Sequence, residues 1–457
     1  MNLGRLTLGC AALACVAGCT SDPNDVNKTM NFLGTAAAAV LEATQPPPPP
    51  PPPPTVVVQQ PVVVAQPVVA QPVVVQQPVV QQPVVQQPVV QQPAVQPPVV
   101  QAPAVQQPAA PALDTSAFAS AVTTATDTAV PEYKYGALNF EKPATPAQIN
   151  EAKEKMASMN VRLDQLRITF DKVDDATIAA TLVQFPEATS VMVNHSDVKS
   201  IAPFALLRNA TRIGLKNIKG LDLKPLAGLT KLTSLDLTYS EVADLSPLAA
   251  LPELKDITFY GATVTSFAPL AACPKLQRVY FYAAVTSKEG YDSLGTLKQV
   301  TQFHGGLTKM TSIAWLRQVP QAQEVKLFAE KIEDYSPISS LPNLTYLRLW
   351  NQNGGNLSTA VGDLQFLAPC TKLQTLELPS CKFTNTAVLA GLPELKNVDL
   401  SDAKAPVSIA FATKLPKLTR LNLSRTTVTD GAVAASLPKT VRVITDKKTQ
   451  GVPASNP

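Results

Sequence analysis

The chain has 457 residues, of which only 16% are charged, and its formal net charge is +4. Nucleic-acid-binding proteins need a clustered basic face, so this weak surplus gives no reason to expect nucleic acid as a partner. The 43 prolines are too concentrated to belong to one folded domain, so we expect an extended segment beside a folded one.

Residues 1–18 have the organisation of an export signal that is removed. Arg5 supplies a positive charge, the apolar stretch from Leu6 is too short to span a bilayer, and small residues precede Cys19. This cleavage pattern resembles the lipobox of bacterial lipoproteins. The resemblance implies that the Cys19 thiol carries a diacylglyceryl group and that the new amino terminus is acylated. An ordinary secretory signal with an accidental cysteine is the alternative.

A lipid on Cys19 implies that the membrane is a partner and that the chain lies outside the cytoplasm, because two or more acyl chains hold a protein stably at a bilayer. Thr20 stands where an aspartate would indicate retention at the inner membrane of enteric bacteria, so the resemblance favours the outer membrane or the cell surface. No second long apolar run follows, and the sequence predicts no transmembrane helix.

The next three segments have biased compositions. Residues 19–45 form a membrane-proximal segment whose apolar residues suit a short helix. Residues 46–111 begin with nine prolines and continue in PVVQQ and PVVVAQ units, which block helix and sheet and favour extended polyproline II. We interpret them as a spacer, with a ligand for proline-recognition modules as the alternative. Residues 112–144 are expected to be a polar connector.

The folded part is predicted to begin with a cap helix over residues 145–165. Thr145 and Gln148 form a capping-box pattern with Pro146 at the first helical position, and an apolar stripe follows at helical spacing. A repeat array over residues 166–446 and a polar tail over 447–457 complete the predicted organisation.

The array repeats with a period of 22 residues. Successive units read ATRIGLKNIKGLDLKPLAGLTK from Ala210, LTSLDLTYSEVADLSPLAALPE from Leu232 and LKDITFYGATVTSFAPLAACPK from Leu254; the unit from Leu344 carries an insertion around 353–356. The spacing LxxLxL followed by PLxxLxxL resembles leucine-rich repeats, most of all the internalin type of bacteria. The resemblance implies an α/β-type solenoid, a horseshoe with a parallel β-sheet on its concave face and short 3-10 or α segments on its convex face.

The repeats depart from the family pattern after the strand, where the usual asparagine is absent. We therefore expect that the hydrogen bonds between coils are supplied differently or that the turn is looser. The equivalent positions hold Ser240, Ala262, Thr308, Gln352, Cys381, Ala403 and Thr426. Cys273 and Cys370 occupy leucine positions, which favours buried thiols, with a disulfide between Cys370 and Cys381 as the alternative.

The outward strand positions of neighbouring coils are predicted to line up into one concave surface. In the middle coils these solvent-facing positions are rich in aromatic and basic residues, although the chain is only 5% aromatic. Tyrosine, tryptophan and arginine dominate binding hot spots, so we predict a ligand-binding face. Its residues are Tyr260, Tyr280, Tyr282, His304, Lys326, Phe328, Tyr346, Arg348 and Trp350. The alternative is that the rings only stiffen the sheet.

No catalytic residue, metal site or cofactor is predicted. No nucleophile, base and orienting acid can be assembled around His304, and His195 lies several coils away. The four cysteines that remain after signal removal lack zinc-ligand spacing. The sequence thus predicts a lipid-anchored envelope protein, not an enzyme, that binds a protein or peptide. Binding of a glycan or other cell-wall polymer, and a structural role through self-association, are the alternatives.

Overall fold

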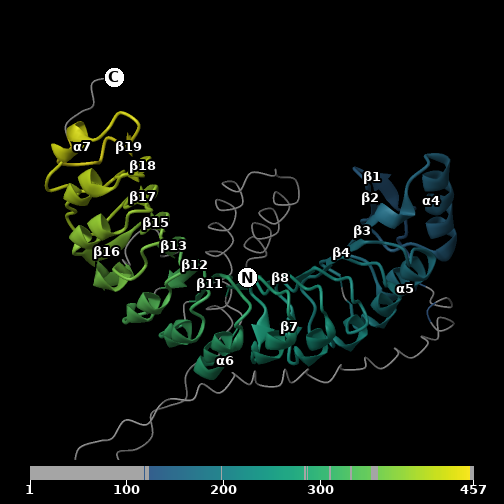
Figure 1. Ribbon diagram of the computed structural model, residues 1–457. Coiled ribbons are helices and arrows are strands. Elements are labelled where there is room, and N and C mark those ends of the chain that lie inside the picture. Colours follow the sequence, from purple (N-terminus) through teal and green to yellow (C-terminus); the bar gives the residue numbers. More distant parts are fainter. Residues whose placement is uncertain are drawn as a thin grey trace, which may run out of the picture. The chain divides into compact units, whose positions relative to one another are not determined.

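The computed structural model describes residues 123–452, apart from 197, 283–284, 286, 308–309, 330–331 and 351–358, together with Phe118. In this part of the chain the strands pair into one 15-stranded sheet, with short helical segments on the other side of each coil (Figure 1). The predicted signal, the Cys19 anchor, the proline-rich segment and the insertion at 353–356 lie outside the described residues.

The sheet begins with a hairpin that the sequence did not predict. Strands β1 (Glu132–Lys134) and β2 (Ala137–Phe140) pair antiparallel, and β2 then pairs in parallel with β3 (Arg167–Asp171). The expectation of a connector is therefore wrong for this stretch. Alternation along β2 buries Leu138 and Phe140, and the Phe140 ring centroid lies 4.9 Å from that of Phe170 in β3.

Helix α4 (Pro146–Ser158) lies between β2 and β3 and has the predicted capping box. The Gln148 backbone N–H donates to Thr145 Oγ1 at 3.3 Å, and the Thr145 N–H donates to Gln148 Oε1 at 2.8 Å. Its inner face buries Ile149, Ala152 and Met156. The short segment η3 (Leu163–Gln165) follows, and the first coil contains helix α5 (Asp175–Gln184), which Asp174 caps.

From β2 onward neighbouring strands of the main sheet are parallel, as the repeats predict. They are β4 (Ser190–Asn194), β5 (Arg212–Leu215), β6 (Ser234–Asp236), β8 (Asp256–Thr258), β10 (Arg278–Tyr282), β11 (Gln302–Leu307), β12 (Glu324–Ala329), β13 (Tyr346–Trp350), β15 (Thr375–Glu377), β17 (Asn397–Asp399), β18 (Arg420–Asn422) and β19 (Arg442–Ile444). Two smaller sheets pair β7 (Glu241–Val242) with β9 (Thr263–Val264), and β14 (Thr359–Asp363) with β16 (Cys381–Thr384).

Short helical segments form the opposite side of the coils. They are η4 (Ala202–Leu206), η5 (Lys224–Leu226), η6 (Ser246–Ala250), η7 (Ala268–Ala272), α6 (Lys288–Asp292), η8 (Ser293–Thr296), η9 (Ala314–Gln318), η10 (Ser336–Ser340), η11 (Leu364–Leu367), η12 (Thr386–Gly391), η13 (Ala410–Lys414) and α7 (Val433–Ser436). The predicted leucine-rich-repeat solenoid is confirmed by this arrangement of one parallel sheet and short helical segments.

The core lies between the sheet and the helical segments and runs through all the coils. In the coil from Leu232, the strand residues Leu235 and Leu237 and the later residues Leu245 and Leu248 are all buried. No single coil can cover these side chains, so each depends on its neighbours. Truncating one such leucine to alanine costs about 2–5 kcal/mol in typical cores.

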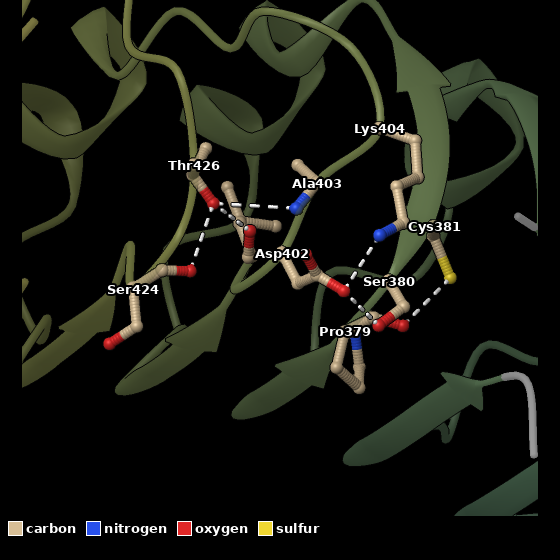
Figure 2. Close-up of polar contacts among 9 residues, drawn as sticks. Pro379, Ser380, Cys381, Asp402, Ala403, Lys404, Ser424 and Thr426 are labelled. Carbon is tan, nitrogen blue, oxygen red and sulfur yellow. Dashed lines mark hydrogen bonds and ion pairs between the residues drawn. The ribbon is translucent and has the colours of Figure 1, made fainter. Parts of the chain in front are cut away.

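A left-handed residue turns the chain at the end of many strands. These residues have φ between 46° and 64°; they are His195, Asn217, Tyr239, Gly261, Ser380, Asp402 and Arg425. At Asp402 side chains support the turn: Ser380 Oγ and Lys404 Nζ each donate to Asp402 Oδ2 at 2.8 Å (Figure 2). The left-handed conformation disfavours residues with a Cβ, so such contacts offset part of its cost.

Hydroxyl and thiol groups replace the missing asparagine, as expected. Ser240 Oγ donates to the Leu215 carbonyl at 2.8 Å and accepts from the Ile218 N–H at 3.0 Å. Thr426 Oγ1 donates to the Leu400 carbonyl at 2.8 Å and accepts from the Ala403 N–H at 3.4 Å (Figure 2). Among the other described equivalent positions, Cys381 Sγ lies 3.4 Å from the Leu349 carbonyl, and Ala262 and Ala403 have no polar side chain. Thr308 and Gln352 lie outside the described residues.

Cys273, Cys370 and Cys381 are free, buried thiols. Burial raises the pKa of Cys273 to about 11 and those of Cys370 and Cys381 to about 12, so all three stay protonated at neutral pH. The prediction of buried thiols is confirmed, and the alternative of a disulfide between Cys370 and Cys381 is wrong for this structure.

Candidate functional site

Three rows of side chains cross the open face of the sheet, the face that points away from the core. They line up because β8, β10, β11, β12 and β13 pair in register. The first row is Asp256, Arg278, Gln302, Glu324 and Tyr346; the middle row is Thr258, Tyr280, His304, Lys326 and Arg348; the last row is Tyr260, Tyr282, Gly306, Phe328 and Trp350. All nine predicted ligand-binding residues lie in these rows.

The last row contains two pairs of contacting aromatic rings, one on each side of Gly306, which together we call the ring strip. The ring centroids of Tyr260 and Tyr282 are 5.7 Å apart, and those of Phe328 and Trp350 are 5.9 Å apart. Tyr239, a left-handed corner residue, extends the strip with its ring 5.4 Å from that of Tyr260 and is 36% exposed. Burial raises the pKa of the Tyr260 and Tyr282 hydroxyls, so both stay protonated at neutral pH.

The cations of the open face lie beside carboxylates. Lys216 Nζ is 3.0 Å from Asp236, Arg278 is 3.1 Å from Asp256, Lys326 is 2.5 Å from Glu324, and Arg348 is 3.4 Å from Glu377. Aromatic rings cover three of these cations as well; the Arg278 guanidinium is 6.0 Å from the Tyr280 ring centroid. The Lys326 ammonium is 4.6 Å from the Tyr346 ring centroid, and the Arg348 guanidinium is 4.8 Å from that of Trp350.

His304 and Phe328 lie in the rows but are not solvent-exposed, and the prediction that these two positions face solvent is wrong. The exposed fraction is 5% for His304 and 4% for Phe328. The Tyr280 ring lies edge-on to His304 with 4.8 Å between centroids, and the Trp350 ring packs against Phe328. Large side chains on neighbouring strands therefore cover residues that alternation alone would expose.

The buried imidazole and the adjacent carboxylate differ in charge. Burial lowers the pKa of His304, so the ring is neutral at pH 7. Burial acts to raise the pKa of Glu324, but its contacts with His304 and Lys326 outweigh that effect and lower the pKa to about 2. His304 Nε2 lies 3.0 Å from Glu324 Oε1, within ion-pair distance but without the alignment of a hydrogen bond.

Two glycines in β11 make room for these rings. A Cβ atom on Gly306 would lie 1.6 Å from Phe328 Cβ on the open face. A Cβ atom on Gly305 would lie 2.2 Å from the Phe281 ring on the core face. Strand β11 is therefore thin on both faces, and rings of the neighbouring strands fill the space.

Sequence reasoning missed the charged residues of the first row and one exposed ring. Asp256, Arg278 and Glu324 belong to the first row, the position just before the first strand leucine, which the sequence analysis represented only by Tyr346. Tyr239 was missed because it lies beyond the strand, at the corner. The repeat period contains the signal that would have found them, since these positions are separated by about 22 residues from the equivalent positions in neighbouring coils.

A hollow of about 550 Å³ lies elsewhere, beside helix α5. Its acidic side chains and its histidine are already engaged. Asp174 accepts from Thr123 Oγ1 at 2.5 Å, and His195 Nδ1 lies 3.0 Å from Asp171. Asp175 accepts from the Lys199 N–H at 3.2 Å. With these groups committed to one another, the hollow has a weaker claim to a ligand than the three rows.

Within the described residues, no group of three or more histidine, cysteine or acidic side chains is placed to hold a metal ion. His195 contacts Asp171, whereas His304 contacts Glu324, so the two histidines belong to different parts of the array. The arrangement on the open face offers rings, hydroxyls and compensated charges for non-covalent contacts.

No family model matches the sequence, and no curated protein matches it. Among solved structures, an internalin of Listeria monocytogenes is 21% identical over 66% of this chain and 89% of its own, with a TM-score of 0.49. A leucine-rich-repeat protein of Leptospira interrogans is 14% identical over 62% of this chain and 72% of its own, with a TM-score of 0.48.

A chain of the Drosophila Toll–Spätzle complex has the higher TM-score of 0.52, at 12% identity over 68% of this chain. The matched region spans 43% of that chain. At this identity the likeness shows the fold alone, which is the leucine-rich-repeat solenoid described above. Across the described residues, no helix has both the length and the apolar character needed to cross a bilayer.

Proposed function

We propose that the chain is a lipid-anchored protein of the cell envelope whose leucine-rich-repeat domain binds a protein or peptide on the open face. The observation that carries the proposal is the strip of contacting rings beside compensated ion pairs on β8 to β13. Partly exposed Tyr260, Tyr282 and Trp350 are residue types that anchor interfaces. The Toll–Spätzle complex supports a partner-binding role for this fold.

The proposal assigns no catalytic step to the chain. It places the domain outside the cytoplasm, at the outer membrane or cell surface, through a lipid on Cys19, and treats residues 46–111 as a spacer. The alternative role for the rings is to stiffen the sheet. Partial exposure of Tyr239 at 36% favours binding, because a ring that served packing alone would gain by complete burial.

Affinity capture tests the ligand-binding face. The full-length chain in mild detergent is used to capture partners from envelope extracts, with Tyr282→Ala/Trp350→Ala as the test variant. Tyr135→Ala is the matched control, since Tyr135 is 87% exposed in the β1–β2 turn and lies outside the three rows. We expect the wild type and the control to recover a common protein partner that the double variant loses.

Equal recovery by all three proteins would refute the assignment of the face. Recovery of wall glycan in place of a protein would support the glycan alternative, and recovery of further copies of the same chain would support self-association.

Metabolic labelling tests the anchor. Cells that express the chain are grown with a clickable fatty acid, and the wild type is expected to carry the label and to sediment with membranes. Cys19→Ser is expected to lose the label and to keep its unprocessed length. Cys10→Ser, within the signal, is the control and should remain labelled. An unlabelled wild type, or a labelled Cys19→Ser protein, would contradict the anchor.

A further inference from the structure

We infer that the open face binds an uncharged, extended peptide of the polyproline type, which lies along the last row across β8 to β13. This inference rests on the proposed function and names the chemistry of its ligand. It follows from the charges of the face, the kind of groups in the last row, and the length of that row.

The charges beside the last row are paired. Four cations, Lys216, Arg278, Lys326 and Arg348, lie within 3.4 Å of four carboxylates, Asp236, Asp256, Glu324 and Glu377. A charged ligand would have to separate one of these pairs and leave a partly buried charge without its partner, which is costly. An uncharged ligand meets no such barrier.

The last row carries no formal charge over many coils. From β6 to β18 its described positions are Thr238, Tyr260, Tyr282, Gly306, Phe328, Trp350, Pro379, Ser401 and Ser424. In the middle of this row, Gly306 and the buried Phe328 lie between Tyr260, Tyr282 and Trp350, whose rings carry hydroxyl or indole donors. Aromatic-lined grooves recognise proline-rich segments with this chemistry, because proline rings pack on aromatic faces and the free backbone carbonyls accept hydrogen bonds.

A neutral glycan fits the same face less well. Recognition of sugar hydroxyls needs polar side chains that are free to donate and accept. The carboxylates of Asp256, Glu324 and Glu377 are instead held by Arg278, Lys326 and Arg348. The groups left over are ring faces and single hydroxyls, which suit a ligand with apolar side chains and few donors of its own.

The row also has a useful length. Four steps between strands separate Tyr260 from Trp350. At about 4.8 Å per step the row measures roughly 19 Å, which equals about six residues of polyproline II at 3.1 Å per residue. A peptide of this kind loses little conformational freedom on binding, since it is already extended before it meets the face.

Calorimetric titration of the full-length protein in detergent tests the inference. The probe is a ten-residue oligoproline peptide. It is compared with three peptides of equal length: a neutral Gly-Ser peptide, an oligoproline in which some prolines are replaced by lysine, and one in which some are replaced by aspartate. We expect saturable binding of oligoproline that changes less than twofold when the salt concentration is raised, with at least roughly tenfold weaker binding of the other three peptides.

The test variants replace aromatic residues of the last row, and the control variant lies outside the three rows. Trp350→Leu and Tyr282→Leu keep apolar bulk while removing the aromatic ring, and each is expected to weaken oligoproline binding by roughly tenfold. Tyr135→Ala should bind as the wild type does, and circular dichroism checks that every variant folds. The titration is repeated with residues 46–111 deleted, so that the chain's own proline-rich sequence does not compete with the probe.

Three outcomes would overturn the inference: tighter binding of a charged peptide, equal binding by the ring variants, or binding of wall glycan fragments in place of oligoproline. The failure of the inference can be told apart from the failure of the proposed function. If capture still recovers a protein partner that depends on Tyr282 and Trp350, the binding face stands and only the ligand class is wrong. If capture fails as well, both are wrong.

Discussion

At the scale of single residues, the open face depends on side chains that are absent as much as on those that are present. Gly305 and Gly306 leave both faces of β11 free, so that Phe281 fills one side and Phe328 the other. Phe328 then packs against Trp350, the final ring of the last row. Because β11 has no side chains at these two positions, large rings on the neighbouring strands occupy the space above and below it.

Gly306→Ala is therefore expected to destabilise the domain by about 1–3 kcal/mol, since the new Cβ overlaps Phe328 and β11 must shift. Urea unfolding followed by circular dichroism measures the change. Gly391→Ala is the matched control, because no atom lies within 4 Å of the Cβ position there. Equal stability of the two variants would show that β11 moves without resistance.

Glu324 gives the domain a dependence on pH. Its pKa falls from the ordinary 4.5 to about 2 on folding, so its stabilising contribution is complete above pH 4.5 and is lost as the pH falls towards 2. His304 acts in the same direction, because burial lowers its pKa and the unfolded chain takes up a proton more readily below pH 6.5. Acid therefore destabilises the folded state through both groups.

Glu324→Gln is expected to reduce the fall in thermal midpoint between pH 4.5 and pH 2.5, since the variant has no carboxylate to protonate. Melting curves at a series of pH values measure this slope. Glu333→Gln, at an exposed carboxylate of the same coil, should keep the wild-type slope. An unchanged slope in Glu324→Gln would show that other groups govern acid unfolding.

At the scale of elements, hydroxyl groups join consecutive coils where leucine-rich repeats usually have asparagine. Ser240 joins its own coil to Leu215 and Ile218 of the preceding coil, and Thr426 does the same for Leu400 and Ala403. Each hydroxyl is fully buried. One hydroxyl can both donate and accept, which satisfies two backbone groups in the space of a small side chain.

Ser240→Ala is expected to lower the free energy of unfolding by about 1–3 kcal/mol, because a buried N–H and a buried carbonyl lose their partner. Chemical denaturation provides the measurement. The methyl group itself fits, since Ala262 occupies the equivalent position one coil later. Ser339→Ala, at an exposed hydroxyl on η10, is the control and should change stability by less than about 0.5 kcal/mol.

The repeat spacing was sufficient to predict the fold and the rows, because a 22-residue period fixes which side chains stack. It could not predict burial at His304 and Phe328, since cover comes from the rotamers of Tyr280 and Trp350 on neighbouring strands. The hairpin was missed for another reason. Leu138 and Phe140 alternate over only four residues within a polar stretch, which is too short a pattern to separate from a connector.

At the scale of the whole domain, the two ends of the array differ. The first strands are followed by α4, which buries Ile149, Ala152 and Met156. At the other end no residue of β19 or α7 is buried. Since stability in a repeat protein is a sum over neighbouring coils, the coil that contains β19 gains less from buried contacts than the coils in the middle of the array.

Hydrogen exchange should show this asymmetry. We expect the amides of β19 to exchange faster than those of β10, β11 and β12 by roughly tenfold or more, because local opening costs least where few side chains are buried. Exchange mass spectrometry with peptide resolution measures it. Equal protection along the sheet would indicate that the domain opens only as a whole.

The one-to-one register of the strands also bears on how such a gene changes in length. Loss of Leu254–Lys275 would join Glu253 to Leu276 with the same spacing as before, and the two flanking coils would meet as neighbours. Unequal recombination between repeat units can thus add or remove one coil without changing the register of the other coils. A change in the number of coils that carry the ring strip would also lengthen or shorten the strip. The length of peptide that the face can bind would then depend on the number of these repeat units.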